Sequence, residues 1–179
     1  APYLPLAEVL GRFFAEFTRG GLKTLTLEIA GDLAAFDGTP LTAAYKPVSR
    51  EPADRAFVLM RSRFGATLVP AKRIVQHLIE QRGSVKLLAL VADQSPPASS
   101  DQQSWRPFFG EETAFFRGPG WIGAKLGYSV YLAAMHCERR GHYVVRFIEL
   151  ARAGTRQEPD QILTAYTRAL EQHVRQYPE

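Results

Sequence analysis

The chain has 179 residues, 46% hydrophobic and 11% aromatic, which is enough for one globular domain with a substantial core. Its 22 Lys+Arg against 18 Asp+Glu give a net charge of +4, which favours an acidic partner such as a phosphorylated lipid surface or an acidic carrier protein; no clustered basic motif points to nucleic acid. The single cysteine, Cys137, excludes an internal disulfide and a cysteine-cluster metal site, and no apolar stretch approaches the roughly 20 residues of a membrane span.

An amphipathic helix is the first predicted element, in residues 1–22. Apolar side chains recur at helical spacing from Leu6 to Phe17, charged residues lie opposite them, and Gly20 and Gly21 end the helix. The ordinary interpretation is a helix packed on the core, and the alternative is an aromatic face lying on a membrane.

Helices and strands alternate in the next segment. We expect helices in residues 27–36, 49–65 and 71–83, and strands in residues 40–45, 67–70 and 85–92. This alternation is typical of a mostly parallel sheet covered by helices. The nearly continuous apolar run VKLLALVA, residues 85–92, predicts a central strand of that sheet.

The second half of the chain begins with a predicted loop, residues 94–112. A Gly-rich helix is expected in residues 118–127, and the apolar runs 128–139 and 142–150 predict an antiparallel strand pair at one edge of the sheet. A helix in residues 160–176 closes the chain. The sequence therefore predicts an α/β fold in a single domain, residues 1–179, with a mostly parallel central sheet flanked by helices.

The stretch LVADQSPP, residues 90–97, ends an apolar run in a carboxylate, an amide and two prolines. In open α/β sheets ligands bind beyond the carboxyl ends of the strands, so Asp93 is placed at the rim of a site. Asp93 can equally cap a turn before Pro96, a common role of aspartate. The residues alone leave both interpretations open.

Four stretches carry a resemblance to a known family by their order and spacing: YKPVSREPADRAFVLMRSRFGATLVP, LLALVADQSPP, WRPFFGEETAFFRGPGWIGAKLGYSVY and RRGHYVVRFIEL. Over roughly residues 27–179 the chain resembles the bacterial lipid A biosynthesis acyltransferases (lauroyl or myristoyl transferases) of the lysophospholipid acyltransferase superfamily. Their usual transmembrane anchor and Trp- and Arg-rich tail are not found in this sequence, so we expect the chain to be incomplete.

The resemblance implies an enzyme at the cytoplasmic face of the bacterial inner membrane. It implies transfer of a fatty acyl chain from acyl carrier protein to a hydroxyl of a lipid A precursor, with no metal and no bound cofactor. An alternative from another class is a catalytically inactive lipid-binding homologue. A nucleotide-binding protein is disfavoured because no Gly-rich fingerprint follows a strand.

The catalytic signature of the family is a histidine, four residues, and then an aspartate or glutamate. The resemblance places Glu28 at the acid, but Lys23 stands five residues earlier, and none of the four histidines has an acid five positions on. The strand that leads into this motif is not recognised in GGLKTLT, residues 20–26. We therefore expect a His/Glu general-base mechanism whose histidine this chain does not display.

Chemistry explains why the family needs this pair. Attack of a lipid hydroxyl on a thioester requires a base, a role worth about 10²–10⁴ in rate. Histidine has a suitable pKa, and a carboxylate fixes its tautomer, whereas lysine is charged at pH 7 unless it is strongly desolvated. The alternative for Glu28 is an ordinary solvated acid in the first turn of a helix.

The resemblance implies roles for further residues. Arg61 and Asp93 match an arginine and an acid that the family needs; the guanidinium can bind phosphate or steady an oxyanion, and Asp93 can orient it. Lys46 and Arg55 flank the matched sequence YKP and are candidates for contact with phosphate. The alternative is that both are ordinary solvated cations. The aromatic candidates for an acyl groove or the bilayer interface, with core packing as the alternative, are Trp105, Phe108 and Phe109.

Overall fold

The computed structural model describes residues 24–29, 41–47, 49, 51–62, 66–82, 84, 87–98 and 101–178. The chain divides into two compact units. Unit 1 comprises Ala1–Thr26, Asp32–Val91 and Cys137–Tyr143, and unit 2 comprises Leu27–Gly31, Ala92–His136 and Val144–Glu179. The predicted helix of residues 1–22 and the position of Lys23 lie outside the described residues.

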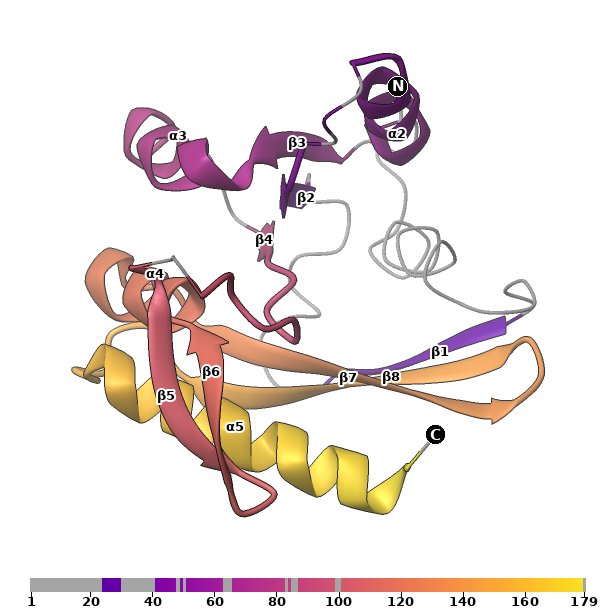
Figure 1. Cartoon of the computed structure of the whole chain (residues 1–179), viewed down its shortest axis with the longest axis vertical. Coiled ribbons are helices and arrows are strands. Elements are labelled where there is room, and N and C mark those ends of the chain that lie inside the picture. The colour runs from indigo at the N-terminus through magenta and orange to yellow at the C-terminus, as the bar shows by residue number, and fades with distance from the viewer. Residues whose placement is uncertain are drawn as a thin grey trace. The chain divides into compact units, whose positions relative to one another are not determined.

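Unit 1 contains the predicted parallel sheet. Strand β2 (Leu41–Tyr45) lies between β3 (Thr67–Pro70) and β4 (Leu87–Ala89), and both pairings are parallel (Figure 1). Helix α2 (Glu51–Ser62) connects β2 to β3, and the 3₁₀ turn η2 (Ala71–Arg73) with helix α3 (Ile74–Glu80) follows β3. The predicted alternation is thereby confirmed for residues 41–89.

One prediction within this sheet is wrong. Residues 85–92 were expected to form a central strand. Among the described residues 87–92, β4 comprises Leu87–Ala89, is half-buried, and lies at the edge of the described sheet. The central position belongs to β2, in which Leu41 and Ala43 are each 1% exposed. An apolar run indicates that a segment is buried, but it does not show how many strands pair with that segment.

Unit 2 contains a β-hairpin where the sequence predicted a loop. Strand β5 (Gln103–Phe108) pairs antiparallel with β6 (Glu111–Phe116), with Trp105 opposite Ala114 and Pro107 opposite Glu112. Pro107 argues against a central strand because it has no N–H to donate. In a two-stranded sheet each strand has a free edge, so the proline is tolerated.

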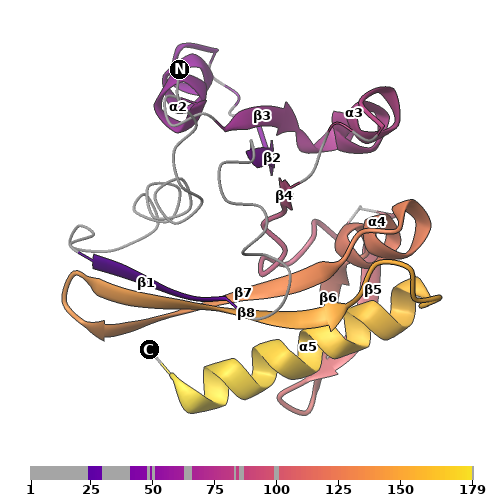
Figure 2. The ribbon, with the colours of Figure 1, turned by 180° about the vertical axis from the view of Figure 1, so that it is seen from behind.

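Strands β7 (Val130–Arg139) and β8 (His142–Ala151) confirm the predicted pair, joined by the expected turn. In the part of the chain that the structure describes, they belong to a separate sheet with β1 (Thr24–Ile29), in the order β1-β8-β7 (Figure 2). Strand β1 corrects two expectations: residues 27–29, expected to begin a helix, are in a strand, and residues 24–26, where no strand was recognised, belong to the same strand. The alternation Thr-Leu-Thr-Leu has the period of two that strands require.

Helices α4 (Gly118–Leu126) and α5 (Pro159–Gln176) pack together in unit 2 and confirm the predicted helices. Their contact is close because Gly120 has no side chain: a Cβ there would lie 2.5 Å from the carbonyl oxygen of Pro159. Ile162 and Leu163 of α5 are 2% and 3% exposed. The mixed α/β class predicted from the sequence is confirmed by this set of elements.

Candidate functional site

The tip of the β5/β6 hairpin carries two of the predicted aromatic residues in an unusual backbone conformation. Phe109 has φ 53° and Gly110 has φ 85°, so both turn residues adopt positive φ. A two-residue hairpin turn of this shape normally has Asn-Gly or Asp-Gly, because a bulky residue is strained there. Phe109 is nevertheless 42% exposed, and Trp105 on the same hairpin is 57% exposed.

A row of aromatic rings runs from this tip to helix α5. The ring centroids of Phe109 and Phe108 are 4.9 Å apart, those of Phe108 and Phe115 5.4 Å, and those of Phe115 and Tyr166 6.1 Å, each pair edge to face. Such pairs add about 0.5–1.5 kcal/mol beyond their buried area. Phe108 therefore packs between Phe109 and Phe115, while Phe109 and Trp105 retain exposed surface.

Helix α5 also fixes the hairpin through polar contacts at both ends. Near the tip, the backbone N–H of Phe109 donates to Oε2 of Glu171 (3.2 Å), and the Arg175 guanidinium donates to Oε1 of the same carboxylate (2.6 Å). These hydrogen bonds, with that from Arg175 first, lower the pKa of Glu171. At the start of α5, Arg106 pairs with Asp160.

Asp93 lies in a bend four residues beyond β4, where its residue is exposed. Burial first, and the negative charge of Asp93 second, raise the pKa of Tyr166 above its ordinary value of 10.0. The Asp93 carboxylate is therefore within electrostatic range of the Tyr166 hydroxyl. Through Tyr166, Asp93 and the aromatic row belong to one region of unit 2.

Lys46 and Arg55 belong to unit 1, and both are exposed. Lys46 directly follows β2, and Arg55 lies in α2. They flank a contact in which the Tyr45 hydroxyl donates to Oδ2 of Asp54 (3.5 Å), which brings the end of β2 close to the first turn of α2. Lys46 thus lies at the carboxyl end of the central parallel strand, and Arg55 lies in the helix that follows it.

Glu28 lies in β1 and Arg61 in the last turn of α2. Their side chains lie outside the described part of the chain. The convergence of Glu28, Arg61 and Asp93 on one cavity stays a prediction.

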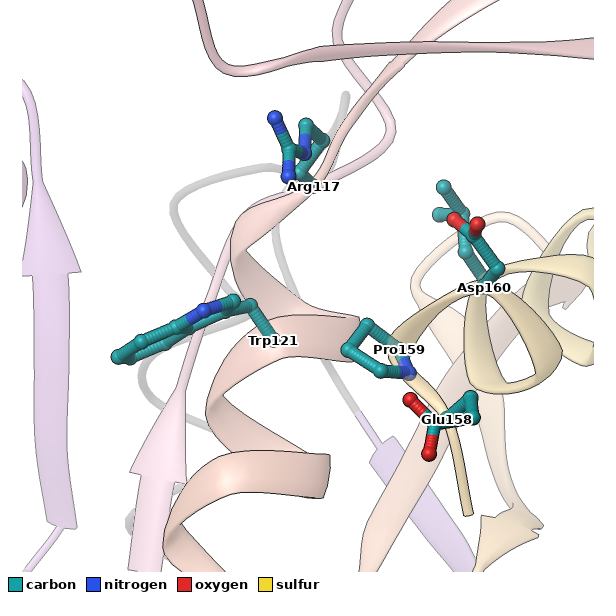
Figure 3. A pocket seen from close by; sticks show the side chains of 6 residues that line it. Arg117, Trp121, Glu158, Pro159 and Asp160 are labelled. Atoms are coloured by element: carbon teal, nitrogen blue, oxygen red, sulfur yellow. The ribbon is translucent and has the colours of Figure 1, made fainter.

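A second candidate region was missed by the sequence analysis. A cavity of about 290 Å³ opens in unit 2 beside the starts of α4 and α5 (Figure 3). Its lining residues are Arg117, Trp121, Glu158, Pro159, Asp160 and Leu163. Trp121 lies in the predicted Gly-rich helix and Arg117 just before it, but neither was given a role, and Glu158 to Asp160 carry no motif, so only the fold brings them together.

Among the residues that the structure describes, no group of three or more His, Cys, Asp and Glu side chains is arranged to hold a metal ion. No described helix is both long and apolar enough to cross a membrane.

Unit 1 has an α/β arrangement, a class in which sites form at the carboxyl ends of parallel strands. Unit 2 carries a hairpin with exposed aromatic rings. Comparison with protein families gives a match to the bacterial lipid A biosynthesis acyltransferases over residues 22–179. The chain belongs to this family, as the resemblance indicated. A search of individual curated proteins gave no match.

Proposed function

We propose that the protein transfers a fatty acyl chain from acyl carrier protein to a hydroxyl of a lipid A precursor at the cytoplasmic face of the inner membrane. The observation that carries the proposal is the family match over residues 22–179. The exposed aromatic tip of the β5/β6 hairpin adds support, since a fatty acyl chain needs apolar surface, and such surface costs free energy while it faces water.

The proposed reaction joins the acceptor oxygen to the thioester carbonyl carbon and breaks the carbon–sulfur bond, and the released carrier thiol takes up the proton. A base removes the hydroxyl proton as the oxygen attacks. Glu28 orients that base, Arg61 binds phosphate or stabilises the developing oxyanion, and Asp93 orients Arg61. Lys46 and Arg55 are proposed to bind anionic groups of the substrates, and Trp105, Phe108 and Phe109 to contact the acyl chain.

Lys23 favours a second candidate function, a catalytically inactive homologue that binds lipid. Lysine lacks a titration near neutral pH unless it is strongly desolvated, so it is a poor replacement for the histidine. Both candidates bind the acceptor lipid, and only one produces an acylated product.

Transfer of labelled acyl groups from carrier protein to a lipid A precursor by the whole gene product distinguishes them. Glu28→Ala, Arg61→Ala and Asp93→Ala are expected to lower the rate by about 10²-fold or more, the scale on which acid–base and oxyanion groups act. Control variants that remove similar charges at exposed positions are Glu138→Ala, Arg82→Ala and Asp101→Ala, and these should retain the parental rate. Parental rates in all three site variants would overturn the site assignment.

A further inference from the structure

An ion pair on helix α5, Glu171 with Arg175, holds the tip of the β5/β6 hairpin, and the acyl-transfer proposal gives neither residue a role. The Arg175 guanidinium donates two hydrogen bonds to Oε1 of Glu171, at 3.1 and 2.6 Å. The other carboxylate oxygen, Oε2, accepts the backbone N–H of Phe109 at 3.2 Å. The pair therefore connects the last turns of α5 to the turn of the hairpin (Figure 1).

The same pair orients the ring of Phe109. The guanidinium carbon of Arg175 lies 4.8 Å from the ring centroid, within the range of a cation–π contact. The ring of Phe108 packs edge to face on the same ring, with the centroids 4.9 Å apart. Phe109 is thus held at its backbone by Glu171 and at its ring by Arg175 and Phe108.

Stability of the fold does not explain this arrangement. Phe109 has φ 53°, a backbone conformation in which a bulky residue is strained and asparagine or glycine is not. Its ring remains 42% exposed, and the Arg175 side chain is 61% exposed, so the ring adds little to the core and the ion pair little to stability. Strained residues that persist in this way are found mainly at ligand-binding sites.

The charges at the tip restrict the kind of ligand that can contact the ring. Glu171 and Arg175 compensate each other, whereas Glu111 and Glu112, both exposed, directly follow the turn. The tip therefore presents an apolar ring beside net negative charge, which repels an anionic headgroup. A neutral hydrocarbon chain meets no such repulsion, and it gains free energy by covering the ring.

We propose that Glu171 and Arg175 are positioning residues that hold the Phe109 ring against the acyl chain of the donor, and that they thereby raise the selectivity for long chains over short ones. The inference rests on the proposed function, because the chain in contact with the ring is the one that the protein transfers. Neither residue touches the reacting atoms, so both act through Phe109.

Transfer from dodecanoyl and butanoyl carrier protein measures this selectivity as the ratio of two values of kcat/KM. Arg175→Ala should lower the ratio about tenfold, chiefly through a higher KM for the dodecanoyl donor, because a four-carbon chain covers little of the ring. Arg168→Ala removes an exposed cation two turns earlier in α5 and is the matched control, with the parental ratio expected. Thermal unfolding checks that both variants are folded. Equal ratios in folded Arg175→Ala and Arg168→Ala would overturn the inference.

A double-mutant cycle determines whether Arg175 acts through the ring. Phe109→Asn removes the ring and should lower the selectivity ratio at least as much as Arg175→Ala does. Addition of Arg175→Ala to Phe109→Asn should then cause no further decrease, since two residues that act as one unit are not additive. If Arg175→Ala causes the same decrease with and without the Phe109 ring, the arginine acts independently of Phe109 and the inference is wrong.

Binding of dodecanoyl-pantetheine, a neutral thioester without carrier protein, separates this inference from the proposed function. If calorimetry shows that the parental protein binds this thioester about tenfold more tightly than Arg175→Ala does, but no acyl group is transferred, only the proposed function fails. If dodecanoyl groups are transferred and every variant keeps the parental ratio, only the positioning role fails. Binding to phosphatidylglycerol vesicles that depends on Arg175, without binding of the thioester, would assign the ring to a membrane surface and overturn the inference.

Discussion

The guanidinium carbon of Arg175 lies 4.8 Å from the ring centroid of Phe109, and the same guanidinium is hydrogen-bonded to Glu171, which accepts the backbone N–H of Phe109. Helix α5 therefore holds both the ring and the backbone of one exposed residue at the hairpin tip. A residue with positive φ and an exposed ring contributes little to the core, so we propose that the fixed ring of Phe109 contacts a ligand.

Phe109→Asn tests this explanation through a comparison of stability with activity. Asparagine relieves a backbone strain of about 1–2 kcal/mol, while loss of the Arg175 contact costs about 0.5–1 kcal/mol and loss of the edge-to-face pair with Phe108 about 0.5–1.5 kcal/mol. These contributions nearly cancel, so the free energy of unfolding should fall by no more than about 1.5 kcal/mol. Acyl transfer should fall about tenfold in kcat/KM because apolar contact is lost. Urea unfolding and the transfer assay measure the two quantities. A stability loss above about 2 kcal/mol with unchanged kcat/KM would make Phe109 a structural residue.

Glu171 predicts a pH dependence of stability. Its pKa is lowered in the folded protein from the ordinary value of 4.5, first by the Arg175 hydrogen bond and then by the Phe109 N–H. A lowered carboxyl pKa stabilises the fold above the unfolded value, and this contribution disappears as the pH falls through the folded value.

The unfolding midpoint of the parental protein should therefore decrease more between pH 6 and pH 3 than that of Glu171→Gln. Glu138→Gln, an exposed glutamate on β7, is the control and should follow the parental curve. Parallel curves for the parental protein and Glu171→Gln would show that this carboxylate does not stabilise the fold.

Gly120→Ala tests the close contact of α4 with α5. The added methyl group meets the carbonyl oxygen of Pro159 at 2.5 Å, so the helices must move apart, at a cost of about 1–3 kcal/mol. Gly118→Ala, two residues earlier in the same helix, has no atom within 4 Å of the added group and should be neutral or slightly stabilising. Chemical denaturation measures the free energy of unfolding of the two variants. Equal stabilities would contradict the packing described for α4.

Ile162→Ala tests the core beneath α5. Ile162 is 2% exposed, and truncation of such a side chain costs about 2–5 kcal/mol. Val174→Ala, at a 37% exposed position in the same helix, should change the free energy of unfolding by less than about 0.5 kcal/mol. Comparable losses in the two variants would mean that α5 packs through a different face.

The sequence was informative where local pattern and tertiary environment agree. Helices α2, α4 and α5 and strands β2, β3, β7 and β8 were predicted because periodicity, turn residues and burial coincide in them. The hairpin β5/β6 was missed because Pro107 disfavours a strand, and nothing local reveals that the strand has a free edge. Strand β1 was missed although polar and apolar residues alternate in it, because the short run has only two leucines between its threonines.

The residues of the candidate site were harder to predict from the sequence than the fold. The end of an apolar run pointed to Asp93 but left a turn cap equally open, and the family resemblance then favoured a role at the site, because the separation of the site residues along the chain carries no periodic signal. Contacts between distant segments, such as Phe109 with Glu171 or Gly120 with Pro159, are fixed by folding and leave no trace in spacing. The cavity lined by Arg117 and Trp121 is likewise formed by segments that are distant in the sequence.

Mass spectrometry of the acceptor decides whether the protein transfers an acyl group or only binds lipid. The whole gene product is incubated with acylated carrier protein and a lipid A precursor, and both partners are weighed intact. The account predicts that the acceptor gains one acyl group in place of a hydroxyl hydrogen while the carrier returns to its free thiol. An acceptor that binds the protein but keeps its mass would contradict the account and identify an inactive homologue.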